Sequence, residues 1–114
     1  MQQSRLLWAT CFSALALTVG CAQREVYIEG YSEARSSHER QEYAKAIEQY
    51  QAYVAEHPES PLVVPVTYQI AECNEALGKT DQAVAHYRKV IELQPDGTWA
   101  RASKDKLARL ARTR

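Results

Sequence analysis

The sequence predicts an all-α protein made of two helical hairpins and one further helix. Residues 43–58, YAKAIEQYQAYVAEHP, return at 80–95 as TDQAVAHYRKVIELQP, with tyrosine, alanine and proline in matching places. In both copies the apolar residues follow the period of one face of a helix. Each copy ends at a proline, which cannot continue a helix. These observations predict a helical hairpin that occurs twice in the sequence.

A helical segment precedes each copy, at about residues 26–40 and 65–77, and would form the first helix of each hairpin. Gly78 stands where the end of a helix favours a left-handed residue, and Thr80 is the predicted N-cap of the next helix. Pro65 lacks an N–H donor, so we expect the regular helix to begin near this residue after an irregular turn.

The last helix is expected to cap the second hairpin, with Thr98 as its N-cap. A cap is needed because one hairpin cannot bury its own apolar faces, and two hairpins are fewer than the roughly three repeats that a stable stack usually needs. We expect Trp99 to cover the face formed by Tyr87 and Ile91. The apolar edge of this helix consists of Trp99, Leu107, Leu110 and Ala111.

At these residues the chain resembles the tetratricopeptide repeat, a helix-turn-helix unit of about 34 residues. The turn glycine, the two close-packing positions and the terminal proline of the family match Gly78, Ala83, Tyr87 and Pro95 in the second copy. The first copy matches with Tyr43, Ala46, Tyr50 and Pro58. The resemblance implies a tetratricopeptide-like α-solenoid domain over 27–114, with repeats at about 27–60 and 64–97 and a capping helix at about 98–112.

The two prolines are 37 residues apart, and the extra length falls in the link ESPLVV at 59–64. This longer link is similar to that of the periplasmic tetratricopeptide lipoproteins of β-barrel assembly, and to the repeat domain of the Tol-Pal-associated coordinator of cell-envelope constriction. The first helix departs from the family pattern, because smaller or polar residues occupy places that are usually bulky: Gly30, Glu33 and Ser37.

The N-terminal residues 1–20 have the features of a secretory signal peptide. A polar start with one charge, Arg5, precedes an apolar run from Leu6 to Val19. This run is shorter than the roughly 20 residues of a membrane-spanning helix. An uncleaved anchor is the alternative reading.

The sequence LTVGC at 17–21 resembles the lipobox of bacterial lipoproteins, in which the cysteine is acylated and becomes the mature N-terminus. The resemblance implies palmitate-type acyl chains on Cys21, no other cofactor, and a short anchored linker at 21–26. Aspartate after the cysteine holds such lipoproteins in the inner membrane, so Ala22 implies the periplasmic face of the outer membrane. The alternative is an ordinary signal peptide that ends near a cysteine.

The charged residues argue against a dedicated nucleic-acid binder, because 14 basic and 14 acidic side chains cancel. They are unevenly placed: residues 101–114 carry a net charge of +5, and residues 22–100 carry −6. Once Cys11 leaves with the signal and Cys21 is acylated, Cys73 has no internal disulfide partner. We expect Cys73 to be a buried, inert residue.

Candidate catalytic or metal-binding groups are few, so we expect neither an enzyme nor a metal site. His38, His57 and His86 lie far apart, and none has a second ligand one helical turn away. Glu72 and Glu75 share a helix face, but such adjacent carboxylates are usually solvated. No glycine-rich phosphate loop and no nucleophile beside a base is present in the sequence.

Binding of a protein is the function that remains. In tetratricopeptide proteins the first helix of each hairpin lines a concave groove. The resemblance places in this groove Tyr31, Arg35, His38, Tyr68, Glu72 and Glu75. The alternative for the two tyrosines is packing between the hairpins.

The sequence therefore predicts a lipid-anchored adaptor that binds another envelope protein or a peptide segment of one. Exposed repeat faces could also support self-association. One alternative is a pilotin-like chaperone of a secretion or pilus subunit. Another is a peripheral envelope factor whose basic last helix binds anionic lipid or a cell-wall polymer.

Overall fold

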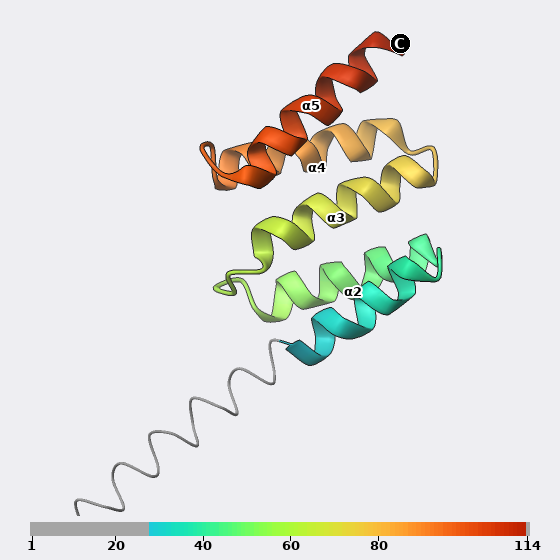
Figure 1. The fold of residues 1–114 in the computed structure, drawn as a ribbon. Helices are drawn as coiled ribbons and strands as arrows, with labels where there is room; N and C mark the ends of the chain where they lie inside the picture. The colour runs from blue at the N-terminus through green and yellow to red at the C-terminus, as the bar shows by residue number, and fades with distance from the viewer. Residues whose placement is uncertain (1–27, 114) are drawn as a thin grey trace, which may run out of the picture.

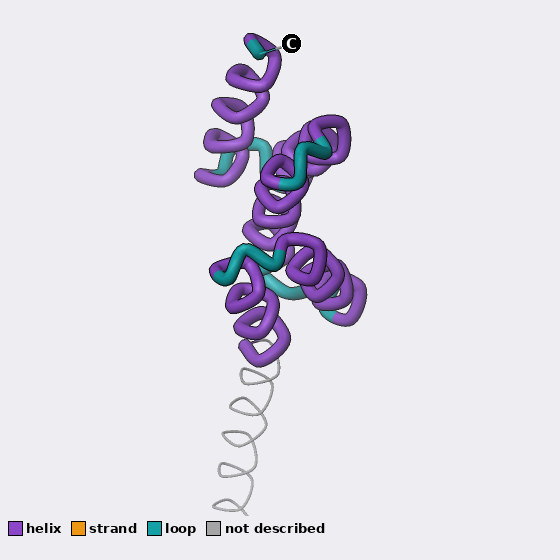
Figure 2. Tube along the Cα trace, turned by 90° about the vertical axis from the view of Figure 1, so that its right-hand side faces the viewer, coloured by secondary structure: helices purple, strands orange, loops and turns teal. Residues whose placement is uncertain are grey.

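The computed structural model describes residues 28–113, which form a stack of helices joined by short loops (Figures 1 and 2). The described chain begins within a helix that continues to residue 39, called here the first helix. It is followed by α2 (Tyr43–Glu56), α3 (Val63–Ala76), α4 (Thr80–Leu93) and α5 (Thr98–Arg112). The first helix and α2 lie at one end of the stack, and α4 and α5 lie at the other (Figure 1). The prediction of an all-α solenoid is confirmed for these residues.

Several predicted features lie outside the described residues. They are the signal peptide at 1–20, the acylated Cys21, the linker at 21–26, and residues 27 and 114 of the predicted repeat domain. Within the described part, no helix combines the length and the apolar character that crossing a membrane requires.

Both hairpins turn in the same way, although the residues at the turn differ. Gly78 has a φ of 76° and follows α3, where its N–H bonds to the carbonyl of Glu75 while the N–H of Lys79 bonds to Asn74. This is the Schellman arrangement that ends many helices. Gln41 has a φ of 63° and makes the equivalent turn after the first helix. A left-handed residue is therefore required at both turns, and only the second is a glycine.

Three predicted helix starts were wrong by one or two residues. α3 begins at Val63, so Pro65 is its third residue, where the missing N–H does no harm because first-turn amides have no intrahelical partner. Thr80 and Thr98 are the first residues of α4 and α5 and not their N-caps. The N-cap positions belong to Lys79 and to Gly97, and neither makes a side-chain capping bond.

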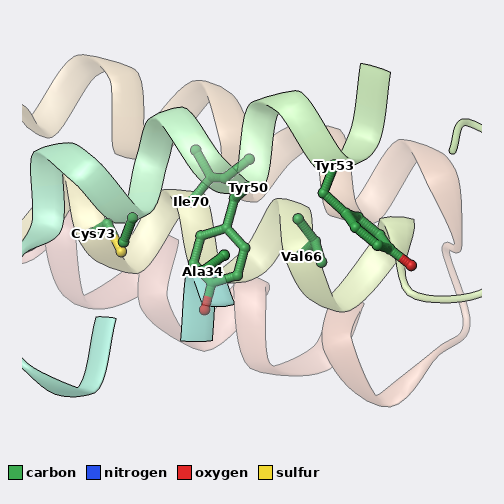
Figure 3. Close-up of a cluster of buried hydrophobic side chains, with 7 residues drawn as sticks. Ala34, Tyr50, Tyr53, Val66, Ile70 and Cys73 are labelled. Carbon is green, nitrogen blue, oxygen red and sulfur yellow. The ribbon is translucent and has the colours of Figure 1, made fainter. Parts of the chain in front are cut away.

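The core consists of two clusters of buried side chains, and α3 contributes to both. One joins the first helix, α2 and α3 (Figure 3): Ala34, Ala46, Tyr50, Tyr53, Val66, Ile70 and Cys73. The other joins α3, α4 and α5: Tyr68, Ala71, Ala83, Tyr87, Val90 and Leu110. Tyr50 and Tyr87, which match in the two copies, are both fully buried. The repeated stripe therefore supplies the aromatic centre of each cluster.

The first helix departs from the family pattern because a larger ring fills the space beside it. Tyr53 stands in the first copy where Val90 stands in the second, and both are buried. A Cβ added to Gly30 would lie 3.4 Å from the Tyr53 ring. This is an ordinary van der Waals distance, so the Tyr53 ring already lies directly beside the backbone at position 30.

The fifth helix caps the second hairpin, but Trp99 is not its buried anchor. The Trp99 side chain is 36% exposed and packs on Tyr68 of α3, with ring centroids 5.1 Å apart. The ring contact of Trp99 is thus with α3, whereas the sequence predicted that it would cover Tyr87 and Ile91 of α4. Leu110, which is 7% exposed, is the large apolar residue that α5 buries.

Cys73 is fully buried in the first cluster and is a free thiol, as expected. Burial, with a smaller contribution from the charge of Glu72, raises the pKa of the thiol to about 12. The reactive thiolate is therefore scarce at neutral pH.

Candidate partner-binding site

An open hollow of about 340 Å³ lies where the first helix, α3 and α5 converge. Its lining combines two carboxylates, one ammonium group, two aromatic rings and one methyl group: Glu72, Glu75, Lys106, His38, Tyr43 and Ala76. The residues come from four helices, so the stacking of the repeats builds the hollow. We call it the groove hollow.

The structure brings together three of the six groove residues predicted from the sequence, His38, Glu72 and Glu75. Tyr31 instead packs between the helices of the first hairpin. Its ring lies 6.4 Å from that of Tyr50 and 6.3 Å from that of Tyr53, and its hydroxyl accepts a hydrogen bond from Gln69.

Tyr68 and Arg35 do not line the groove hollow either. Tyr68 is only 8% exposed and lies between the rings of Tyr87 and Trp99. Burial is the main cause that raises the pKa of its hydroxyl. Arg35 is exposed and pairs with Glu39 of its own helix at 3.0 Å. Both tyrosines therefore pack against neighbouring helices: Tyr31 contacts α2 and α3, which fits the predicted alternative of packing between the hairpins, whereas Tyr68 packs within the second hairpin and its cap.

The α5 side of the groove hollow is held by two ion pairs. Lys106 Nζ lies 3.8 Å from Glu72, and both side chains are about one-third exposed. Arg109 pairs with Glu75, which also accepts a hydrogen bond of 2.8 Å from the buried hydroxyl of Tyr87. Partial burial would raise the pKa of Glu75, but the bonds from Arg109 and Tyr87 outweigh it and hold the pKa below its ordinary value.

The first-helix side of the groove hollow is aromatic. His38 lies with its ring 5.9 Å from that of Tyr43 and 6.1 Å from that of Tyr50. Its Nδ1 is 3.3 Å from the hydroxyl of Tyr50. These contacts hold the imidazole in the lining of the groove hollow, which it shares with the two carboxylates.

Sequence reasoning missed Lys106 and Arg109 as parts of the site, although a signal was present. Each lies 34 residues after its carboxylate partner, Glu72 or Glu75, which is the length of one standard repeat. Residues one repeat apart on equivalent helices are neighbours in a solenoid. Opposite charges at this separation therefore indicate an ion pair between the helices.

The other two histidines take no part in this site. His86 contacts the carbonyl of Gln82 within α4, and the ring of His57 packs on Tyr53. Among residues 28–113, no group of His, Cys, Asp or Glu side chains could hold a metal ion.

Comparison with protein families supports the repeat assignment. The model of the tetratricopeptide repeat family matches residues 30–60 and residues 66–97, more than half of the chain. A comparison with curated proteins and one with solved structures each found no match.

Proposed function

Because the chain belongs to the tetratricopeptide repeat family, we propose that it is a non-catalytic adaptor that binds a segment of another protein in the groove hollow. The repeats of this family are interaction modules. The observation that carries the proposal is the mixed lining of the groove hollow, in which Glu72, Lys106 and His38 meet from three helices.

The Glu72–Lys106 pair is suited to exchange with a partner. At 3.8 Å and about one-third exposure it is long and partly solvated, so it stabilises the fold by at most about 1 kcal/mol. A cation of the partner could replace Lys106 beside Glu72, while the rings of His38 and Tyr43 supply contact area at low entropic cost. The segment that fits best is a short one with a basic residue next to an apolar one.

We place this adaptor at the periplasmic face of the outer membrane, anchored through acyl chains on Cys21. Only five residues, 22–26, would separate that cysteine from the predicted first helix. They span at most about 18 Å when extended. A partner that is itself bound to the envelope would be favoured, because tethering raises the local concentration of both proteins.

The charged contacts bear on the alternatives. Lys106 and Arg109 of α5 are engaged by Glu72 and Glu75, so fewer cations remain for anionic lipid or cell-wall polymer. A pilotin-like chaperone would use the same groove hollow, with a secretion or pilus subunit as its cargo. Identifying the captured protein distinguishes this role from that of a general envelope adaptor.

The test of the groove hollow is charge reversal at Glu72, which leaves the buried Tyr68 intact. We expect Glu72→Lys to abolish capture of the envelope partner by the full-length protein, while circular dichroism shows an unchanged helix content. Glu48→Lys is the matched control, because it makes the same charge change at an exposed position of α2. Capture that is equal in both variants would remove the groove hollow from the proposal.

The test of the anchor is Cys21→Ala. We expect the variant to lose radioactive palmitate and to leave the membrane fraction. Equal label in the variant and the unmodified protein would refute acylation at this cysteine.

A further inference from the structure

The two ends of the helical stack carry uncovered surfaces of opposite charge. Inside the stack, α3 packs between α2 and α4, whereas α5 packs on α4 and α3 and is followed by no further helix among the described residues. At the other end, the first helix has exposed residues on the side away from its neighbours. The two ends point in opposite directions (Figure 1).

The surface at the α4–α5 end is an apolar hollow with a basic edge. This hollow of about 270 Å³ is lined by Val84, Arg88, Leu107, Leu110 and Ala111. Lys104 lies one turn before Leu107 on the same face of α5, since residues three apart are neighbours on a helix. Arg88 and Lys104 are exposed, and neither forms an ion pair with another described residue.

The surface at the first-helix end has the opposite character. An open hollow here is lined by Ile28, Glu29, Ser32, Glu33 and Ser36. Ile28 is 55% exposed, more than Leu93, Leu77 or Trp99. Glu29 and Glu33 stand one turn apart beside it. Glu33 accepts a hydrogen bond from Gln49, and neither carboxylate pairs with a cation of the described chain.

We propose that these two ends bind each other between copies of this chain, head to tail. The exposed face of the first helix of one copy docks on the α4–α5 hollow of the next. Ile28 enters the hollow beside Leu107, and the carboxylates of Glu29 and Glu33 face the basic edge. Apolar burial supplies the affinity, and the opposite charges select the orientation.

A second copy is the occupant because both halves of the contact stand on one chain. Residues 101–114 carry a net charge of +5, and because Lys106 and Arg109 are paired with Glu72 and Glu75, Lys104 is the cation of this segment that stands beside Arg88 at the hollow. A symmetric contact between two α4–α5 hollows would bring Arg88 and Lys104 of one copy close to the same residues of the other. Repulsion between these cations disfavours such a contact. The head-to-tail contact leaves one free surface at each end of the assembly, so it adds copies stepwise and does not close as a dimer.

The first experiment measures the mass of the full-length protein in a mild detergent as its concentration rises. We expect a ladder of assemblies that high salt weakens. Arg88→Glu with Lys104→Glu should weaken association about tenfold or more. Lys89→Glu is the control for a charge reversal elsewhere on α4, because Lys89 lines a separate hollow formed by α2, α3 and α4. Association that is equally weak in the control would overturn the proposal.

The second experiment restores the contact. Glu29→Lys with Glu33→Lys should weaken association to a similar extent, since it makes the first-helix face basic. Mixing this variant with the Arg88→Glu, Lys104→Glu variant again sets opposite charges against each other at every contact. At a concentration where each variant alone is monomeric, we expect the mixture to assemble, which also shows that both variants are folded. A mixture that stays monomeric refutes the pairing of these two ends.

The third experiment locates the contact with a photo-crosslinking amino acid at position 28 of the full-length chain. The expected products join Ile28 of one copy to α4 or α5 of another, and the exposed position Ala52 on α2 serves as the control. Crosslinks to a different protein, a protein that is monomeric at every concentration, or a closed symmetric dimer would each overturn the proposal.

Discussion

α3 meets its neighbours on its two sides by different means. Toward the first hairpin the contact is mainly apolar, formed by residues such as Val66 and Ile70 against Tyr50, and it includes a neutral side-chain hydrogen bond from Gln69 to Tyr31. Toward α5 a second apolar cluster is supplemented by the ion pairs of Glu72 and Glu75. Apolar burial has no direction, whereas charged hydrogen bonds fix an angle and a register. A capping helix, with a neighbour on one side only, depends more on such directional contacts.

The buried tyrosines of the two copies show the same difference. The hydroxyl of Tyr50 lies 3.3 Å from a ring nitrogen of His38, and that of Tyr87 donates to a carboxylate oxygen of Glu75 at 2.8 Å. The rings fill equivalent places in their clusters. Only the hydroxyl of Tyr87 makes a short hydrogen bond to a charged group, and hydrogen bonds to charged groups are stronger than those between neutral groups.

The largest effect is expected from removing either ring. Tyr50→Ala and Tyr87→Ala should each destabilise the protein by about 3 to 5 kcal/mol, because both side chains are fully buried. Since α3 belongs to both clusters, we expect one cooperative transition in a urea titration followed by circular dichroism. A variant that loses only the helices of its own hairpin would show that the two halves unfold separately.

Removing only the hydroxyl should separate the two sites. Tyr87→Phe leaves a partly buried carboxylate with one donor fewer, and we expect it to cost about 1.5 to 3 kcal/mol. Tyr50→Phe removes a long contact and should cost about 0.5 to 1 kcal/mol. The urea midpoints of the two variants test whether Tyr87→Phe loses more stability than Tyr50→Phe. An equal loss at both positions would contradict the special role of Glu75.

The two hairpin turns should respond in opposite directions. Gly78→Ala is expected to cost about 1 kcal/mol, because its φ of 76° is strained for any residue with a Cβ although no atom would clash with one. Gln41→Gly should raise stability by a fraction of this amount, since glycine relieves the strain at a φ of 63° but adds freedom to the unfolded chain. Thermal melts of both variants test the pair, and a stabilising Gly78→Ala would be the contrary result.

The repeat and the helix types could be predicted from the sequence because they rest on local periodicity. The proline-to-proline spacing and the stripe from Ala83 to Val90 suffice to define two stacked hairpins. The boundaries at Pro65, Thr80 and Thr98 could not be predicted in this way. Proline is tolerated in the first turn, where amides have no intrahelical partner, and the two threonines, which are common N-cap residues, here begin the helix itself.

The candidate site was only partly predictable for a different reason. A repeat pattern tells which helix face a residue occupies, and so it found His38, Glu72 and Glu75. Whether a tyrosine on that face is covered depends on the neighbouring helices, and Trp99 at the start of α5 covers Tyr68. Such tertiary contacts have no local signature.

The smallest effect concerns the pH dependence of the junction between α3 and α5. The folded protein holds the pKa of Glu75 below its ordinary value of 4.5, so the fold favours the ionised carboxylate. This contribution is fully present above about the ordinary value and is lost as the pH falls through the lowered folded value. We expect Glu75→Gln, which keeps an acceptor for Tyr87, to cost less than about 1 kcal/mol at neutral pH. The difference in stability from the unmodified protein should shrink as the pH falls below 4.5, and urea titrations from pH 7 to acid measure it.

Glu48→Gln, at an exposed position of α2, is the control and should show no such convergence. A Glu75→Gln difference that stays constant down to acid pH would mean that the charge of Glu75 does not help to hold α5, and would leave the apolar cluster, the Trp99–Tyr68 contact and the Glu72–Lys106 pair as its attachments.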